Sequence, residues 1–334
     1  INAGLVGSEM CIRDRFEMAK INKVFMINTP LFQTKGTHHF MTTKFVGSFQ
    51  MHGLEVTELI DFDHVDDADD QVFLLCDNFY DQLNAAGYDW VSEFDRLAER
   101  FPKTVWLFWT FHNVLYNHYW KPQRPFPFKK VAFTGEYYRS PQYGEGYFPE
   151  YYSTYIGQTE HIDLPFAAGV HPEELDEVLT ERTDKYDCGF CGCQYKSEWT
   201  NKLAEKYNCF VHYWPPFLDE EERLQKAFLD SKICLGFNSD DNIKNGLPTE
   251  RTFEGIAYGC VVLTDCKMAE EATDGVAVYV KDYEDLQRQV DFYLHNESAR
   301  KKKQKEGYEY ALNKGTYYTV AKNFINSIEK LYPN

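Results

Sequence analysis

Residues 245–265 read NGLPTERTFEGIAYGCVVLTD, a pattern that predicts a loop, a helix, a small-residue break at Gly259 and a buried strand. The helix carries Arg251, Thr252 and Glu254 in its first turns. The N-terminus of a helix presents unpaired N–H groups and partial positive charge, which suit a phosphate. Arg251 can pair with a pyrophosphate, and the Glu254 carboxylate can accept hydrogen bonds from two ribose hydroxyls. This stretch therefore predicts a site for a nucleoside diphosphate.

Short apolar runs alternate with helical patterns on both sides of this stretch. Strands are expected at residues 23–28, 54–59, 72–76, 104–109 and 131–134, and again at 187–191, 209–214, 233–237, 261–264 and 276–280. Amphipathic helices are expected at residues 88–100, 197–207 and 220–228, after a cap at Asp282, and at the end of the chain. Strands that alternate with helices in this way form parallel, doubly wound sheets. The fold class is therefore predicted to be α/β, with two Rossmann-like domains.

The domain boundaries follow from changes in composition. Residues 4–15, GLVGSEMCIRDR, resemble translated adapter sequence of the kind found in assembled environmental reads, so residues 1–17 are expected to lie outside the fold. A segment with two prolines, residues 162–172, separates the two α/β halves. The predicted domains are residues 18–165 and 166–316, followed by a closing helix at 317–334.

Composition excludes several classes of partner. The net charge of −17 argues against nucleic acid and anionic membrane surfaces, which require basic patches. No apolar run approaches the roughly 18 residues of a membrane-spanning helix. The nine cysteines are irregularly spaced in a chain of 334 residues, a distribution typical of reduced thiols. A cytoplasmic protein is expected.

The closing part of the chain resembles a known family. GLPTERTFEGIAYGCVVLTD and the later segment that starts GVAVYVKDYEDLQRQV are similar to the glycosyl transferases group 1 superfamily, of the two-domain GT-B type. The nearest branch in this respect is the CgeB-type, spore-maturation-like proteins. The resemblance implies two Rossmann-like domains that face a cleft, with a nucleotide-sugar donor on the C-terminal domain and an acceptor on the N-terminal domain. It also implies that Glu254 contacts the ribose.

One departure from the family and two alternative functions stay open. Related retaining enzymes often carry two glutamates eight positions apart, and this chain has Gly246 at the earlier position. A fucosyltransferase-like GT-B enzyme is one alternative, because Asn238 and Ser239 loosely match a block of that family. A non-catalytic, two-lobed sugar-binding protein is the other. The favoured function is a hexosyltransferase that moves a sugar from a nucleotide diphosphate sugar to a hydroxyl acceptor.

Four candidate donor-binding residues lie in the second half of the chain. Arg251 and Glu254 could instead form an ordinary surface ion pair, since they are three residues apart on a helix. Thr252 can either cap the helix or bind a phosphate. Lys196 follows the first strand of the second half in a turn that contains Gly192, where it can neutralise a phosphate or simply face solvent.

Further candidates lie in the first half, at the expected carboxyl ends of strands. Gly36 and Thr37 follow the first strand and are candidates for contact with the donor. His112 follows the fourth strand, and the resemblance places a histidine at such a strand end near the reacting sugar. Glu136 follows the next strand and can orient or deprotonate an acceptor hydroxyl. Both His112 and Glu136 are predicted to be catalytic.

No metal or cofactor is expected beyond the nucleotide sugar itself. Cys188, Cys191 and Cys193 are close in sequence, but no second ligand pair follows at zinc-site spacing. Helix N-termini and basic side chains can stabilise the departing diphosphate, so the transfer is predicted to be metal-independent. The acceptor is expected to be a carbohydrate, lipid-linked or protein hydroxyl.

Overall fold

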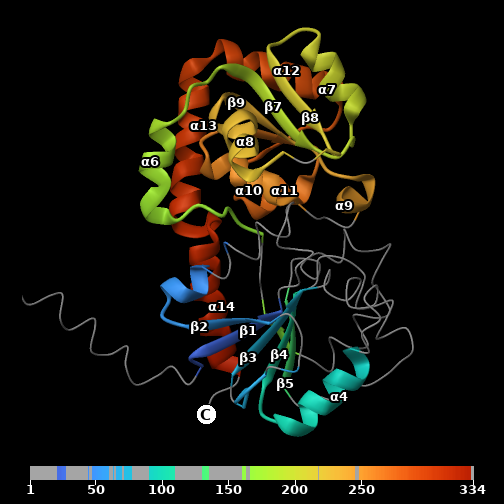
Figure 1. Cartoon of the computed structure of the whole chain (residues 1–334). Coiled ribbons are helices and arrows are strands. Elements are labelled where there is room, and N and C mark those ends of the chain that lie inside the picture. Colours follow the sequence, from blue (N-terminus) through green and yellow to red (C-terminus); the bar gives the residue numbers. More distant parts are fainter. Residues whose placement is uncertain are drawn as a thin grey trace, which may run out of the picture.

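The computed structural model of the chain describes residues 21–27, 44, 47–59, 63, 65–69, 71–76, 90–109, 130–134, 160–162, 166–216, 218–244 and 248–331. Two parallel sheets, each flanked by helices, make up the lower and upper parts of the molecule in Figure 1. We call the part around the strands of residues 23–162 the N-terminal lobe, and the part around the strands of residues 186–279 the C-terminal lobe.

Within the described residues, the N-terminal sheet has six parallel strands in the order β2-β1-β3-β4-β5-β6. They are β1 (Lys23–Ile27), β2 (Glu55–Leu59), β3 (Val72–Cys76), β4 (Val105–Trp109), β5 (Lys130–Thr134) and β6 (Glu160–Ile162). The first five confirm the predicted strands to within a residue at either end. The sixth was not predicted, because its three residues form no apolar run and become a strand by pairing with β5. Helix α4 (Trp90–Arg100) is confirmed and buries Leu97.

The C-terminal sheet has five parallel strands among the described residues, in the order β11-β10-β9-β7-β8. They are β7 (Tyr186–Gly192), β8 (Cys209–Tyr213), β9 (Ser231–Gly236), β10 (Val261–Thr264) and β11 (Val278–Tyr279). The chain runs from β7 to β8 on one side, and then builds β9, β10 and β11 on the other side of β7. The strand order therefore reverses between β7 and β9. In open α/β sheets ligands bind at the carboxyl ends of the strands at such a reversal.

Helices connect these strands and cover both faces of the sheet (Figure 1). They are α6 (Leu175–Thr180), α7 (Ser197–Ala204), α8 (Glu220–Leu224), α9 (Asp240–Lys244), α10 (Glu250–Ala257), α11 (Lys267–Ala272), α12 (Tyr283–His295) and α13 (Glu297–Tyr310), with single turns η2 (Pro172–Glu174), η3 (Gln225–Leu229) and η4 (Ala311–Gly315). Asp282 caps α12 as predicted, since its side chain accepts a 2.8 Å hydrogen bond from the Asp285 amide. No described helix is both long and apolar enough to cross a membrane.

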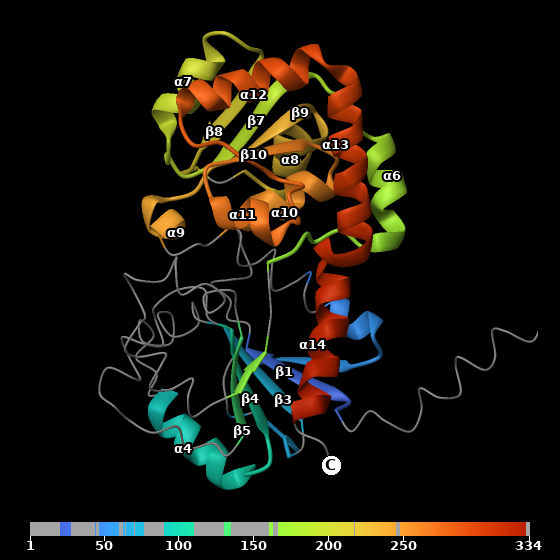
Figure 2. The same ribbon diagram turned by 180° about the vertical axis from the view of Figure 1, so that it is seen from behind.

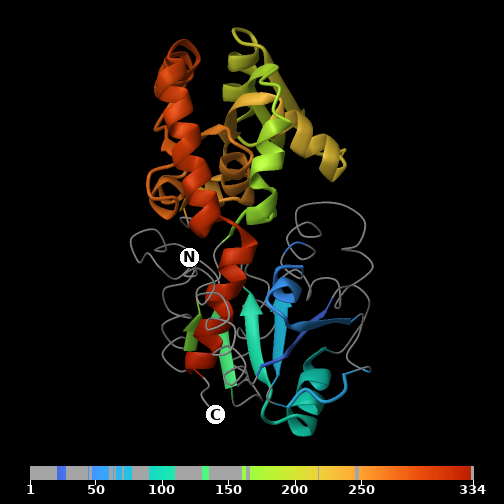
Figure 3. The ribbon, with the colours of Figure 1, turned by 90° about the vertical axis from the view of Figure 1, so that its left-hand side faces the viewer.

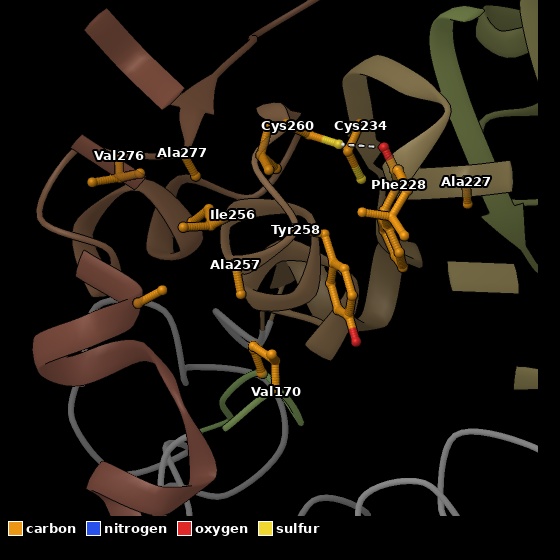
Figure 4. Close-up of a cluster of buried hydrophobic side chains, with 14 of the residues drawn as sticks. Val170, Ala227, Phe228, Cys234, Ile256, Ala257, Tyr258, Cys260, Val276 and Ala277 are labelled. Atoms are coloured by element: carbon orange, nitrogen blue, oxygen red, sulfur yellow. Dashed lines mark hydrogen bonds between the residues drawn. The ribbon is translucent and has the colours of Figure 1, made fainter. Parts of the chain in front are cut away.

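Helix α10 is buried along its length from Arg251 to Ala257. Gly255 allows this close packing, because a Cβ at that position would lie 2.9 Å from Cys234 Sγ and from Val262 Cγ2. Figure 4 shows the apolar cluster beside the helix, which includes Ile256, Ala257 and Phe228. This packing fixes the helix on β9 and β10, and with it the polar side chains of its first turns.

The last helix, α14 (Tyr317–Leu331), leaves the C-terminal lobe and packs against the N-terminal sheet (Figures 2 and 3). Phe324 is fully buried there with Phe49, their ring centroids 6.1 Å apart. Where the chain passes between the lobes, the Ala168 amide donates to Gly315 O at 2.8 Å and the Tyr317 amide donates to Ala168 O at 3.0 Å. The two chain segments that pass between the lobes, at Ala168 and at residues 315–317, are therefore hydrogen-bonded to each other.

Candidate functional site

Arg251 lies at the point where the strand order reverses. Its Nε donates to the carbonyl oxygen of Cys191 in β7, and its Nη1 donates to that of Phe237, directly after β9, each at 2.8 Å. The guanidinium carbon lies 4.9 Å from the centre of the Phe190 ring, and the residue is only 8% exposed. The fold therefore holds a cation between the carboxyl ends of β7 and β9.

The third nitrogen of this guanidinium, Nη2, has no hydrogen-bond partner among the described residues, and no carboxylate in that part of the chain forms an ion pair with Arg251. Gly192 makes room for it, since a Cβ there would lie 2.2 Å from Nη2. A buried cation without a counter-ion is costly, and two parallel N–H donors of an arginine suit a phosphate or carboxylate. The absence of an Arg251–Glu254 pair overturns the alternative of a surface ion pair between them.

The N-terminus of α10 is adjacent. Its N-cap is Thr249, whose side chain makes no capping bond, and Thr252 is fully buried. Neither threonine hydroxyl has a hydrogen-bond partner among the described residues. Capping of the helix by Thr252 is therefore wrong, because its hydroxyl bonds to nothing at the helix end. Binding of a phosphate by Thr252 stays a prediction.

Glu254 is completely buried and is paired with Arg223 of α8. Its two oxygens accept hydrogen bonds from Arg223 Nη1 at 2.5 Å and from Nη2 at 3.0 Å. The sequence predicts a carboxylate open to a ribose, and in this structure that carboxylate instead holds a guanidinium. A buried carboxylate loses its hydration and needs such a partner. Contact of Glu254 with a ribose stays a prediction.

Burial raises the pKa of the Glu254 carboxyl, and the attraction and hydrogen bonds of Arg223 oppose that rise. For Arg223, burial lowers the pKa, but the charge and hydrogen bonds of Glu254, together with the charges of Glu250 and Cys191, outweigh this effect and raise the pKa overall. Arg223 was missed at the sequence level, because it lies in the acidic run DEEERL, which is typical of a solvated helix face. The only clue was that a buried glutamate on α10 requires a cation from elsewhere.

Lys196 lies in the turn after β7 and precedes α7. Its φ of 54° is unusual for a residue other than glycine and indicates a backbone held in place by its surroundings. Its ammonium lies 3.3 Å from Asp240 Oδ1 and 5.4 Å from the centre of the Trp199 ring. Lys196 is thus near the carboxyl ends of β7 and β9, where it can neutralise an anion together with Arg251.

Two further polar residues, Asn238 and Asp265, lie at the same edge of the sheet and were not among the predicted site residues. Asn238 is 1% exposed and Asp265 is 7% exposed. The backbone N–H of Asn238 donates a 2.9 Å hydrogen bond to Asp265 Oδ1, which connects the carboxyl ends of β9 and β10. Asn238 Oδ1 and Asp265 Oδ2 are both buried and have no partner among the described residues. Leaving such an acceptor unsatisfied costs about 1–3 kcal/mol.

The remaining predicted site residues, Gly36, Thr37, His112 and Glu136, lie outside the described residues. The seven cysteines from Cys188 to Cys266 are free thiols. In the described part of the chain, no group of three or more His, Cys, Asp or Glu side chains is arranged to hold a metal ion. Of the predicted donor-binding residues, the structure therefore describes the four in the C-terminal lobe.

Comparisons with known proteins agree with this arrangement. Residues 176–326 match a family model described as glycosyl transferase-like. The chain is also similar in structure to T4 phage BGT in complex with UDP and Mn2+, with a TM-score of 0.53 and 15% sequence identity, over 92% of this chain and 99% of that one. The chain has the GT-B fold.

Two further solved structures are similar to the chain. The N-terminal domain of Candida albicans trehalose-6-phosphate phosphatase matches with a TM-score of 0.50 and 8% identity, over 92% of this chain and 97% of that one. An alpha-glucosyltransferase in complex with UDP and a 13-mer DNA matches with a TM-score of 0.49 and 10% identity, over 89% of this chain and 96% of that one. No curated protein sequence was found to match.

Proposed function

We propose that this GT-B protein is a glycosyltransferase that transfers a hexose from a nucleoside diphosphate sugar to a hydroxyl acceptor. The observation that carries the proposal is Arg251, a buried guanidinium with no carboxylate partner in the described part of the chain, at the reversal between β7 and β9. The family match over residues 176–326 supports the same activity. The closing motif GVAVYVKDYEDLQRQV supports placing the protein in the CgeB-type branch.

In this proposal the diphosphate binds Arg251 Nη2, the Thr252 hydroxyl and the N-terminal end of α10. Lys196 supplies a second positive charge. Glu254 holds Arg223 in its buried position, and contact of its carboxylate with the ribose requires Arg223 to move. These cations stabilise the charge that develops on the leaving diphosphate, so that no metal is needed.

The reaction itself is a displacement at the anomeric carbon of the sugar. The acceptor oxygen forms a bond to that carbon, while the bond from the carbon to the β-phosphate oxygen breaks and its electron pair leaves with the diphosphate. The proton of the acceptor passes to a base, for which Glu136 and His112 are the proposed residues. Gly36 and Thr37 complete the proposed contacts to the donor, and the acceptor is a carbohydrate, lipid-linked or protein hydroxyl in the cytoplasm.

Binding of nucleotides tests the donor assignment. UDP is the first ligand to try, because the BGT structure contains it, and GDP, dTDP, ADP and CDP follow. One nucleotide should raise the melting temperature, and Arg251→Gln should weaken its binding about tenfold or more. The matched control is Arg182→Gln, since Arg182 also binds buried carbonyls, at 2.7 Å from Ser231 O, but at the opposite end of β9. Arg182→Gln should lower stability and leave nucleotide affinity unchanged.

Three outcomes separate the alternatives. Equal nucleotide affinity of Arg251→Gln and the native protein would remove Arg251 from the site. A protein that responds to free sugars but to none of the five nucleotides would be a sugar-binding protein instead. Turnover of a nucleotide-sugar panel, measured with EDTA and with added Mn2+, tests both the transferase activity and its proposed independence of metal.

A further inference from the structure

Asn238 and Asp265 form a buried polar cluster at the carboxyl ends of the neighbouring strands β9 and β10. The side-chain nitrogen Nδ2 of Asn238 donates to Gly236 O at 2.9 Å and to Asp265 Oδ1 at 3.0 Å. Thr264 completes the cluster, since its hydroxyl donates to the same Gly236 oxygen at 2.9 Å. These bonds fix both side chains relative to the sheet.

The orientation of the Asn238 amide follows from these contacts. Its Nδ2 lies against two oxygens that can only accept hydrogen bonds, the Gly236 carbonyl and the Asp265 carboxylate. Turning the amide over would place Oδ1 against those oxygens, which would be repulsive. Asn238 Oδ1 therefore points away from them, and it has no partner among the described residues.

The cluster thus carries two acceptors in need of donors, Asn238 Oδ1 and Asp265 Oδ2. They lie on the edge of the sheet where Arg251 and Lys196 are placed. The positive charge of Lys196 opposes the rise that burial causes in the pKa of Asp265. Helix α9, which follows β9, lies on the side of this lobe that is turned toward the N-terminal lobe (Figure 1). Neither oxygen is exposed to solvent, so a ligand reaches them only when the side chains that cover them shift.

We propose that Asn238 and Asp265 are the subsite that binds hydroxyl groups of the donor sugar, and that they select a neutral sugar over a uronic acid. This inference rests on the proposed function. Sugar hydroxyls are donors, which the two free oxygens need. A carboxylate on the sugar would instead be repelled by Asp265 in a site with little water to screen the charges.

Asp265→Asn is the direct test. The variant keeps one oxygen for the Asn238 amide and replaces the free acceptor Oδ2 by a donor. Affinity for UDP-glucose should fall about tenfold or more, while affinity for UDP alone stays within about twofold of native. GDP-mannose and GDP are the equivalent pair if GDP is the nucleotide that binds.

Asp230→Asn is the matched control. Asp230 is 8% exposed, close to the 7% of Asp265, but it directly precedes β9 and so lies at the opposite edge of the sheet. Its side chain accepts from Thr183 at 2.8 Å and from Gln225 at 2.7 Å, which gives it a structural role. The ratio of UDP-glucose affinity to UDP affinity should not change in Asp230→Asn.

The outcomes distinguish this subsite from the proposed function. If the native protein binds UDP and Asp265→Asn lowers both affinities equally, or neither, the subsite is overturned and the function stands. If no nucleotide binds the native protein, both are overturned. Should Asp265→Asn fail to fold, the native protein still tests the inference: it should bind UDP-glucose about tenfold or more tightly than UDP-glucuronate. Equal binding of the two would overturn the subsite.

Discussion

Arg251 and Glu254 are three residues apart in α10, yet their charged groups have different partners. Arg251 donates to backbone carbonyls at the ends of two strands, whereas Glu254 accepts from Arg223 of α8. Both residues are buried, and a charge inside a protein requires closely placed partners that a neighbouring surface charge does not supply. The two side chains of one helix turn therefore take separate roles.

The buried pair of Glu254 and Arg223 leads to a stability prediction. Glu254→Gln leaves the Arg223 charge without its carboxylate, and we expect the free energy of unfolding to fall by about 3 kcal/mol in urea titrations. The double variant Glu254→Gln with Arg223→Met should lose less than the sum of the two single losses. Glu198→Gln is the control, because Glu198 pairs with Lys202 on the surface, and no measurable change is expected. Additive losses in the double variant would contradict a coupled pair.

Asp265 leads to a prediction about pH. Burial raises the pKa of its carboxyl, while hydrogen bonds from Asn238 and the charge of Lys196 oppose this rise. Since the folded pKa lies above the unfolded value of about 3.9, the contribution of Asp265 to stability is full below that pH and is lost as pH rises through the folded pKa. Asp265→Asn has no such loss. Its unfolding free energy minus the native value should therefore increase between about pH 4 and 7, and a constant difference would contradict the assignment.

At the scale of elements, the turns after β7, β9 and β10 place the candidate residues together. Gly192 ends β7, Lys196 follows it, Asn238 follows β9, and Asp265 follows β10. Parallel strands bring these turns to one edge of the sheet, and α10 adds Arg251 from the connection between β9 and β10. The site is therefore a product of strand order and not of any single motif.

Gly192 provides the test at this scale. A methyl group there would lie 2.2 Å from Arg251 Nη2, so Gly192→Ala must displace the guanidinium. Nucleotide affinity, measured by calorimetry, is expected to fall about tenfold or more. The control is Gly47→Ala, because a Cβ at Gly47 would meet no atom of the described residues within 4 Å. If Gly192→Ala binds nucleotide as tightly as the native protein, Arg251 Nη2 does not contact the diphosphate.

At the scale of the whole molecule, the C-terminal helix joins the two lobes. Helix α14 belongs to the end of the chain but contributes Tyr317, Phe324 and Ile328 to the core of the N-terminal lobe. The chain crosses between the lobes at Ala168 and again at Thr316, and these crossings are bonded to each other. The stability of the N-terminal lobe therefore depends on the last residues of the chain.

Phe324→Ala tests this dependence. Removal of a fully buried phenylalanine is expected to cost about 3–5 kcal/mol, and the loss should appear in the unfolding of the N-terminal lobe. Two lobes need not unfold together, so scanning calorimetry with and without nucleotide is the measurement. Stabilisation by nucleotide should persist, because Arg251, Thr252 and Lys196, which are proposed to bind the diphosphate, lie in the other lobe. Phe292→Ala is the control, since Phe292 is 47% exposed, and a Phe324→Ala protein as stable as that control would contradict the prediction.

The sequence by itself determined the alternation of strands and helices, because apolar runs and helical periodicity are local properties of the chain. Five strands of the N-terminal lobe, the five of the C-terminal lobe and the Asp282 cap were all predicted within the described residues. The sequence also predicted helix α10 and identified its charged residues Arg251 and Glu254 as candidate site residues. The short strand β6 could not be predicted from the sequence, because its three residues form a strand only by pairing with β5.

Only the tertiary structure decided which groups those charged residues meet. Arg223 comes from α8, Asn238 from the end of β9 and Asp265 from the end of β10, and none of these positions carries a local signal of its neighbours. Burial then selects the partners, because a charge or an acceptor removed from water is stabilised only by the groups that the fold places within hydrogen-bond distance. Periodicity sets where a helix forms, and three-dimensional packing sets what its side chains bind.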